Sequence, residues 1–251
     1  MTSPAERVRV VRGRAETPAA DRAVTADLLD WTAESGVPAV RVWQPHRQVA
    51  FGRRDSRESG YGDARAVARE HGFEPTDRRV GGRAVAYTGS TLAIAHAVPI
   101  NDIRQGMCER YKTASQTLVD VLTALGADVT RGEPRDAYCP GSHSVSSVDA
   151  AGEPRAKIAG IAQRVQSGAA LVAACLTVSH HDIEALQDVL APVYHSVGVD
   201  FDPATVGSVE TAGGPEDSKV VTAAIEDALV DGRETTVRTV GDRAPSAATD
   251  Q

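Results

Sequence analysis

The sequence of 251 residues has only three lysines among its 27 basic residues, few aromatic residues and no long apolar run. No segment approaches the roughly eighteen uncharged apolar residues of a membrane-spanning helix. The first residues lack the apolar segment of a secretion signal, so we expect a cytoplasmic protein without membrane contact. With 34 acidic residues the net charge is -7, and no Lys/Arg run is long enough to predict nucleic acid binding. Because arginine binds less water than lysine, this Lys-poor, acidic composition fits a halophilic protein.

Cysteine is also scarce, and the three cysteines are Cys108, Cys139 and Cys175. They are odd in number, widely spaced and never in a CxxC pair, which argues against a disulfide framework and against a zinc site. We therefore predict no metal site. Cys175 lies in the apolar run AALVAACL and is expected in the core, whereas Cys108 begins an amphipathic segment without suggestive neighbours.

Apolar periodicity predicts strands interleaved with helices. Helices are expected at about 20–34, 61–72 and 105–125, with further helices after residue 181. The expected strands are 8–13, 38–43, 48–52, 157–165 and 169–179, and residues 78–99 read as a long strand-like stretch opened by a glycine pair. Residues 166–168 join the last two strands as a hairpin. This pattern favours an α+β fold with a mixed, mainly antiparallel sheet flanked by helices.

Residues 78–85, RRVGGRAV, are the first candidate site. Paired glycines let a backbone come into contact with a ligand, and the flanking arginines can hold a carboxylate or a phosphate. By itself the stretch fits a bulge or tight turn with solvated arginines more readily.

Residues 157–163, KIAGIAQ, are the second candidate. Strand periodicity puts Lys157, Ala159, Ile161 and Gln163 on one face, and Gly160 again permits close approach. A lysine on an apolar sheet face is costly unless it is paired or functional. The alternative, equally supported by the strand alone, is an edge lysine that prevents aggregation.

The third candidate is the loop that contains Cys139, Pro140, Gly141 and His143. Pro-Gly makes a turn that would bring His143 back towards Cys139. A thiol near cationic groups such as His143, Arg135 or Lys157 can act as a nucleophile. On spacing alone the commoner fate, a small buried hydrophobe, is favoured.

Taken in this order, these stretches resemble the lipoate-protein ligase and octanoyltransferase branch of the biotin/lipoate A/B protein ligase superfamily. Residues 49–53 match its V-x-x-G-R segment, residues 78–85 match its Arg-Arg and Gly-Gly-x-Ala-Val turn, and residues 157–164 match K-[IV]-[SAV]-G-x-[AS]-Q-R. The likeness covers about residues 20–210. Many members have a third glycine at the position of Arg83 and an aromatic-His-Asp run at residues 86–88. This chain lacks both, and with the histidine it lacks a group implied in ligase-type phosphate contacts.

The resemblance implies a lipoate-ligase-like catalytic domain over residues 1–210 with a tunnel for an acyl chain. A helical extension at 211–240 is expected to pack on this domain, and residues 241–251 are expected to be disordered. The implied catalytic residues are Cys139 and Lys157. The substrate-binding candidates are Arg78, Arg79, Gly81, Gly82, Arg83, Val85, His143, Ala159, Gly160 and Gln163.

Within this family, the Cys139-Pro140-Gly141 loop favours transfer of octanoyl or lipoyl groups through a thioester, without a cofactor. In that hypothesis Cys139 attacks the acyl donor while Lys157 polarises the carbonyl. The implied partners are lipoyl domains of 2-oxoacid dehydrogenase E2 or the glycine cleavage H protein. The first alternative is an ATP-dependent lipoate ligase that uses Mg, with or without a separate subunit. The second is a non-catalytic protein that binds lipoyl domains or acyl groups.

Overall fold

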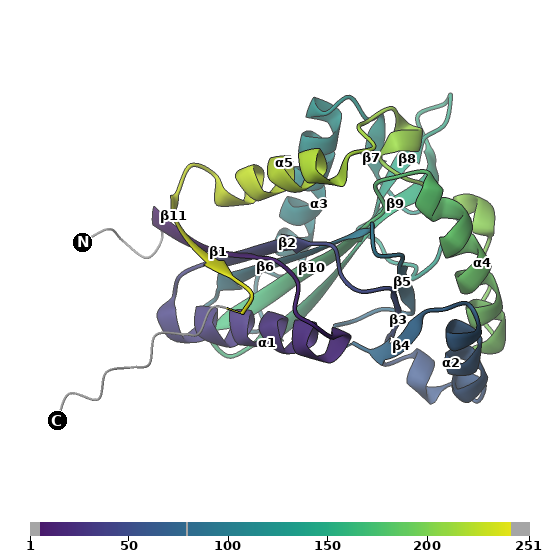
Figure 1. The fold of residues 1–251 in the computed structure, drawn as a ribbon. Helices are drawn as coiled ribbons and strands as arrows, with labels where there is room; N and C mark the ends of the chain where they lie inside the picture. Colours follow the sequence, from purple (N-terminus) through teal and green to yellow (C-terminus); the bar gives the residue numbers. More distant parts are fainter. Residues whose placement is uncertain (1–5, 79, 242–251) are drawn as a thin grey trace.

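The strands lie in two sheets in the computed structural model, which describes residues 6–78 and 80–241 (Figure 1). The large sheet has the order β11 (Glu234–Thr239), β1 (Arg7–Arg12), β2 (Ala39–Trp43), β6 (Leu92–Pro99), β10 (Ala169–Leu176), β9 (Pro154–Gln166), β8 (Val145–Val148) and β7 (Val129–Arg131). The small sheet has the order β4 (Glu74–Asp77), β3 (Gln48–Phe51) and β5 (Val85–Tyr87). Pairing is parallel between β1 and β11, β1 and β2, and β3 and β4, and antiparallel elsewhere. The predicted mixed, mainly antiparallel α+β fold is confirmed.

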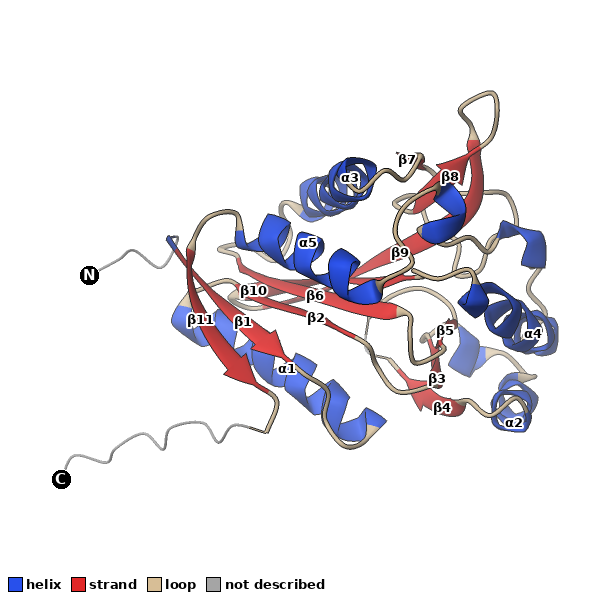
Figure 2. Cartoon of the chain, turned by 45° about the horizontal axis from the view of Figure 1, so that its top comes forward, coloured by secondary structure: helices blue, strands red, loops and turns tan. Residues whose placement is uncertain are grey.

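Helices cover both faces of the large sheet (Figure 1). They are α1 (Pro18–Ser35), α2 (Tyr61–Glu70), α3 (Met107–Ala124), α4 (His181–Ser196) and α5 (Ser218–Val230). Helix α1 lies on one face, and α3 and α5 lie on the other. Helices α2 and α4 lie beside the small sheet (Figure 2). Short 3-10 turns, η2 (Asp55–Arg57), η3 (Pro203–Thr205) and η4 (Glu210–Ala212), complete the described elements.

Local sequence signals explain why helix α1 and the β9–β10 hairpin form. Helix α1 begins where the Thr17 side chain accepts a hydrogen bond from the Ala20 amide, with Pro18 in the first turn, and it ends at Gly36 with a left-handed φ of 67°. The predicted hairpin between β9 and β10 forms, and Gly168, the second residue of its two-residue turn, adopts a φ of 83° that glycine takes without steric cost. Both elements thereby take a defined position over the sheet.

The C-terminal region differs from the expected helical extension. Helix α5 is present, and its Val221 and Ile225 are buried in the main core. Residues 234–239, however, form strand β11, which pairs in parallel with β1. The β-branched residues Thr235, Thr236 and Val237 favour a strand there. The predicted disordered tail falls almost wholly outside the described residues, and the long stretch at 78–99 divides into β5 and β6.

None of the helices in residues 6–78 and 80–241 is both long and apolar enough to cross a membrane.

His96 on β6 is predicted to make the protein sensitive to acid. Burial lowers the pKa of His96 from 6.5 to about 4, and the charge of Arg233 adds to this effect. The unfolded chain binds this proton near pH 6.5, so stability is lost as the pH falls from about 6.5 to about 4. We expect a loss of about 3 kcal/mol over this window.

Urea unfolding of the wild type and of His96→Leu between pH 4 and pH 7 measures this contribution. The other titrating groups are common to both proteins, so the difference in their pH dependence reports on His96. Parallel curves for the two proteins would contradict the prediction.

Candidate active site

A cavity of about 500 Å³ lies between α1 and the face of β6, β9 and β10. Small side chains form its floor: Ala173 of β10 lies opposite Ala162 of β9 and opposite Ala95 of β6. Directly opposite residues project from the same face of a sheet, so these alanines leave room above the strands. Val85, one of the predicted site residues, is buried and lines the same cavity. The lining is mostly apolar and suits a flexible hydrocarbon chain.

Cys139 lines part of this cavity and lies in the loop between β7 and β8. Its Sγ accepts hydrogen bonds from Nη2 of Arg78 at 3.1 Å and from the backbone N–H of Arg83 at 3.3 Å. The sulfur thus faces a cation and an N–H donor, a setting typical of cysteines that act as nucleophiles. Cys139 also has a left-handed φ of 43°, which a non-glycine residue adopts only when its surroundings hold it.

Tyr194 of α4 contributes to holding that conformation. Its hydroxyl accepts a hydrogen bond from the backbone N–H of Cys139 and donates one to the carbonyl of Ala84 at 2.8 Å. One buried phenol therefore connects the thiol loop to the segment that follows the glycine pair.

The backbone of the glycine pair packs against the Cys139 thiol at Gly82. Gly82 has a φ of 99°, and a Cβ added there would lie 2.5 Å from Sγ of Cys139. Gly52 packs in turn on Gly82, because a Cβ at Gly52 would collide with the Gly82 carbonyl oxygen. Gly81 is different, since no described atom lies within 4 Å of its added Cβ. Gly82 is thus required for close approach to the sulfur, whereas Gly81 has no such constraint.

The arginines of this stretch separate into different environments. Arg78 lines the cavity beside Cys139. Burial is the largest single effect and lowers the pKa of Arg78, but Cys139, Tyr87 and Tyr194 together outweigh it, and the net pKa is raised. The Arg83 side chain instead pairs with Asp55 at 3.3 Å and Glu58 at 2.9 Å, so only its backbone faces the thiol. Arg79 lies outside the described residues.

Lys157 is fully buried and does not line the cavity. Its Nζ donates to Glu133 Oε1 at 2.8 Å, to the Tyr138 carbonyl at 2.8 Å and to the Cys139 carbonyl at 2.9 Å. An ammonium has three N–H donors, and all three are used. Gly160 leaves space for the lysine, since its added Cβ would lie 3.2 Å from Lys157 Cε. In this geometry Lys157 holds the thiol loop by two carbonyls.

The predicted alternation along β9 is wrong for Ala159 and Gln163. Val145 and Ser146 of β8 lie opposite Ala159 and Lys157, so β9 has one extra residue at Ile158. Such a bulge reverses the faces of the residues beyond it. Ala159 therefore packs in the core on the face away from the cavity.

Gln163 forms hydrogen bonds with helix α3 and does not face the cavity. Its Nε2 donates to the Met107 carbonyl at 2.9 Å, and its Oε1 accepts from Nε of Arg110 at 2.9 Å. His143 also differs from expectation. Its ring stacks on Tyr111 with centroids 4.4 Å apart, and no hydrogen bond in the described part of the chain joins it to Cys139. Neither residue supplies a base to the thiol.

Glu133, Tyr194 and Cys175 belong to the site but were not predicted as site residues. Glu133 lies in a turn-rich loop and Tyr194 in a helix, and neither shows a sequence signal, because each acts through long-range contacts. Cys175 lies in the core, as expected, and also lines the cavity, where burial raises its pKa to about 12. Within the described residues, no group of three or more His, Cys, Asp or Glu could hold a metal ion.

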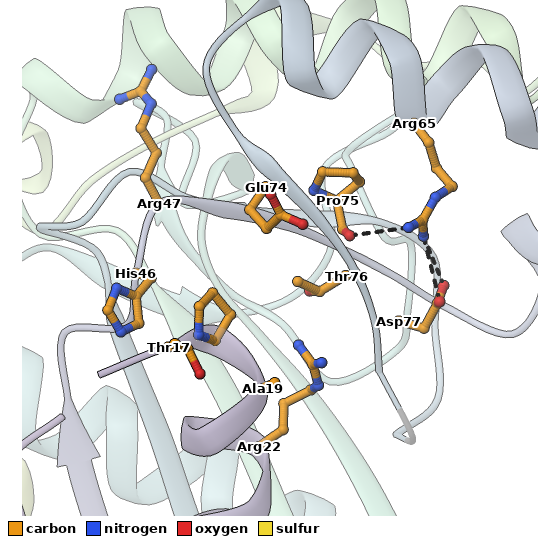
Figure 3. Close-up of a pocket in the computed structure, with 11 residues that line it drawn as sticks. Thr17, Ala19, Arg22, His46, Arg47, Arg65, Glu74, Pro75, Thr76 and Asp77 are labelled. Atoms are coloured by element: carbon orange, nitrogen blue, oxygen red, sulfur yellow. Dashed lines mark hydrogen bonds and ion pairs between the residues drawn. The ribbon is translucent and has the colours of Figure 1, made fainter. Parts of the chain in front are cut away.

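A second, more open pocket of about 580 Å³ adjoins the cavity (Figure 3). Arg22 at the start of α1 and Thr76 and Asp77 at the end of β4 line both spaces. Arg65 closes one side, donating to the Pro75 carbonyl at 3.3 Å and pairing with Asp77 (Figure 3). The two pockets therefore share part of their lining, at the start of α1 and the end of β4.

Relatives of the chain include two types of acyltransferase. It is 33% identical over 144 residues to an octanoyl-[GcvH]:protein N-octanoyltransferase of Exiguobacterium sibiricum, a match that covers 56% of this chain and 49% of the relative. It is 29% identical over 127 residues to a lipoyl-[GcvH]:protein N-lipoyltransferase of Listeria monocytogenes, covering 50% of this chain and 43% of the relative. The chain thus spans about half the length of the curated relatives it matches.

Solved structures share the fold. A lipoate-protein ligase A bound with ATP superimposes with a TM-score of 0.70 at 19% identity, covering 93% of this chain and 89% of that one. A putative lipoate protein ligase from T. acidophilum with bound lipoic acid gives 0.67 at 18% identity, covering 94% and 88%. The family model described as the lipoyl protein ligase A/B catalytic domain matches residues 17–231. With a match over most of its length, the chain belongs to the lipoyl protein ligase A/B catalytic domain family.

Proposed function

We propose that this chain is an acyltransferase that transfers octanoyl or lipoyl groups to a lysine of lipoyl-domain proteins through a thioester on Cys139. The observation that carries the proposal is the position of the Cys139 sulfur, which lies at an apolar cavity with Arg78 and the Arg83 amide as donors. This arrangement supplies a nucleophile and an acyl site together.

The chemistry proceeds in two balanced steps. The Cys139 thiolate attacks the acyl carbonyl of the donor amide, a C–S bond forms, and the C–N bond to the donor lysine breaks as its nitrogen takes a proton. The amine of the acceptor lysine then attacks the thioester, a C–N bond forms, and the C–S bond breaks to return the thiolate, with release of one proton. The thioester divides one difficult exchange into two easier steps.

Lys157 has a different role in this proposal from the one the sequence suggested. Its three donors already bind Glu133 and the Tyr138 and Cys139 carbonyls. Polarising an acyl carbonyl would require Lys157 to release one of these partners. Lys157 therefore acts first by holding the thiol loop, and the backbone N–H of Arg83 is a donor already directed at the reacting sulfur.

The partners follow from the names of the relatives, which refer to GcvH, the glycine cleavage H protein. We infer that an acylated H protein is the donor and that a lipoyl domain of a 2-oxoacid dehydrogenase E2 is an acceptor. The thioester route needs no cofactor. The cytoplasmic location and the choice between octanoyl and lipoyl stay predictions.

The second candidate is ATP-dependent lipoate ligation. It is favoured by the shared ligase fold and by Arg78, a partly buried cation at the cavity whose buried Nε has no hydrogen-bond partner among the described residues. Arg83 fits this role poorly, because its guanidinium is already paired with Asp55 and Glu58. Arg22 and Arg164 also line the cavity, so Arg78 is one of three arginines there that a phosphate could meet.

Intact-mass analysis after incubation with octanoylated H protein tests the proposal. The expected result is an adduct of one octanoyl group that hydroxylamine removes, since hydroxylamine cleaves thioesters. Transfer to the acceptor without any enzyme adduct, together with lipoate-driven ATP–pyrophosphate exchange, would establish the ligase route instead. Retention of an acyl ligand with no transfer in either assay would indicate a binding protein.

A further inference from the structure

Glu133 is linked to the loop that carries Cys139 in two ways, directly through Ser144 and indirectly through Lys157. One carboxylate oxygen accepts the hydrogen bond from Lys157 Nζ at 2.8 Å, and the other accepts one from the Ser144 hydroxyl. Lys157 binds the Cys139 carbonyl, and Ser144 closes the same loop five residues later. The carboxylate therefore joins the two ends of the segment that carries Pro140 and Gly141.

The ion pair also determines where the Lys157 ammonium lies. The Lys157 side chain has no exposed surface, whereas that of Glu133 is 19% exposed. A buried ammonium is costly unless it is paired and its donors are satisfied. Without the carboxylate, Lys157 would keep two carbonyls as partners but would have no counter-charge at hydrogen-bonding distance, and it would be driven towards solvent.

The conformation of Cys139 depends on this arrangement. Its φ of 43° is unfavourable for a residue with a side chain, so the loop must be held from outside. Lys157 holds the Cys139 carbonyl, and Tyr194 holds the amide of the same residue. With both backbone groups bound, the sulfur is directed at Arg78 and the Arg83 amide.

We propose that Glu133 is a positioning residue, which orients Lys157 and thereby holds the Cys139 sulfur in its reactive place. This inference rests on the proposed thioester function. Glu133 touches neither the sulfur nor the acyl cavity, and it acts through Lys157 and Ser144.

The test uses the full chain carrying Cys108→Ser, which removes the exposed thiol. Glu133→Gln keeps the size and an acceptor oxygen but loses the charge, and Glu133→Asp keeps the charge on a shorter side chain. Glu226→Gln is the matched control, because Glu226 is a mostly buried glutamate that pairs with Arg12 on a different part of the large sheet. Each protein is alkylated at Cys139 with iodoacetamide, and its rate of octanoylation by acylated H protein is measured across donor concentrations.

For Glu133→Gln we expect both rates to fall by roughly 30- to 100-fold, the size of effect that a displacement of about 1 Å produces. The donor concentration at half-saturation should stay within about threefold of the wild type, because the cavity is intact. Glu133→Asp should recover part of the rate, and Glu226→Gln should match the wild type. A purely structural role would instead lower the amount of folded protein. It would not lower the maximal rate while leaving the donor concentration at half-saturation unchanged.

Rates within twofold of the wild type in Glu133→Gln would overturn the proposal. The proposal would also be overturned if both Glu133 variants lost rate only in proportion to their loss of thermal stability, and if Glu133→Asp recovered none of the rate. Alkylation needs no acyl donor, so it reports the position of Cys139 even if the transferase proposal fails. That failure would be seen separately, as the absence of an acyl adduct in the wild type.

Discussion

Replacing Cys139 by alanine is expected to abolish acyl transfer, with a residual rate on the order of 10⁴-fold or more below the wild type. Cys139 lines the cavity, and its Sγ accepts a hydrogen bond from Nη2 of Arg78 at 3.1 Å. Alanine fits the same loop, so folding should be preserved while the nucleophile is lost. The measurement is transfer of octanoate from H protein to a lipoyl domain, followed by mass spectrometry.

Cys108→Ser is the matched control, because Cys108 is exposed at the start of α3 and makes no contact with the cavity. It should transfer at the wild-type rate. Cys139→Ser adds a second comparison, since its hydroxyl is a far weaker nucleophile than a thiolate at neutral pH. If Cys139→Ala transferred octanoate at a rate near that of the wild type, the thioester mechanism would be excluded.

The motifs were visible in the sequence, but their contacts were not. The glycine pair and Cys139 are more than fifty residues apart, yet Gly82 packs against the sulfur. Residues 81–82 directly precede β5 of the small sheet, and Cys139 lies in the loop that connects β7 and β8 of the large sheet. Only the packing of the two sheets brings the glycine pair and the thiol together. Apolar periodicity predicts each strand but says nothing about how two sheets meet.

The face assignments failed where a single residue was inserted. Alternation along β9 predicted that Lys157, Ala159 and Gln163 share a face, and the bulge at Ile158 reverses this beyond the lysine. A bulge leaves the composition of a strand unchanged, so periodicity cannot detect it. The same bulge explains why Gly160, and not Ala159, faces the cavity together with Cys139.

The supporting groups of the site had no sequence signal for a related reason. Glu133 is one of many acidic residues in an acid-rich chain, and Tyr194 is one aromatic residue in an amphipathic helix. Each gains its role from one long-range hydrogen bond to the thiol loop or its lysine. The proposed nucleophile, Cys139, could be named from a local motif, whereas the residues that hold its loop could not.

The buried ion pair between Arg41 and Asp21 should contribute the largest single effect on stability. Arg41 Nη2 lies 2.6 Å from Asp21 Oδ1, and the Arg41 side chain has no exposed surface. Burial lowers the pKa of Arg41, an effect that Asp21 partly offsets. Trp43 Nε1 donates to the other Asp21 oxygen at 3.2 Å. We expect Arg41→Met to lower the free energy of unfolding by about 3–5 kcal/mol, because it leaves a buried carboxylate without its cation.

Urea unfolding at pH 7 measures this loss. The control is Lys112→Met, which removes the cation of a pair in which Lys112 and Glu109 are both exposed, and it should cost less than about 1 kcal/mol. Adding Asp21→Asn to Arg41→Met removes the stranded charge, so the double variant should be more stable than Arg41→Met alone. A double variant no more stable than the single one would contradict this explanation. Asp21 and Trp43 also line the cavity beside Cys139, so a stable double variant with slow octanoyl transfer would indicate that the charged pair is kept for the shape of that cavity.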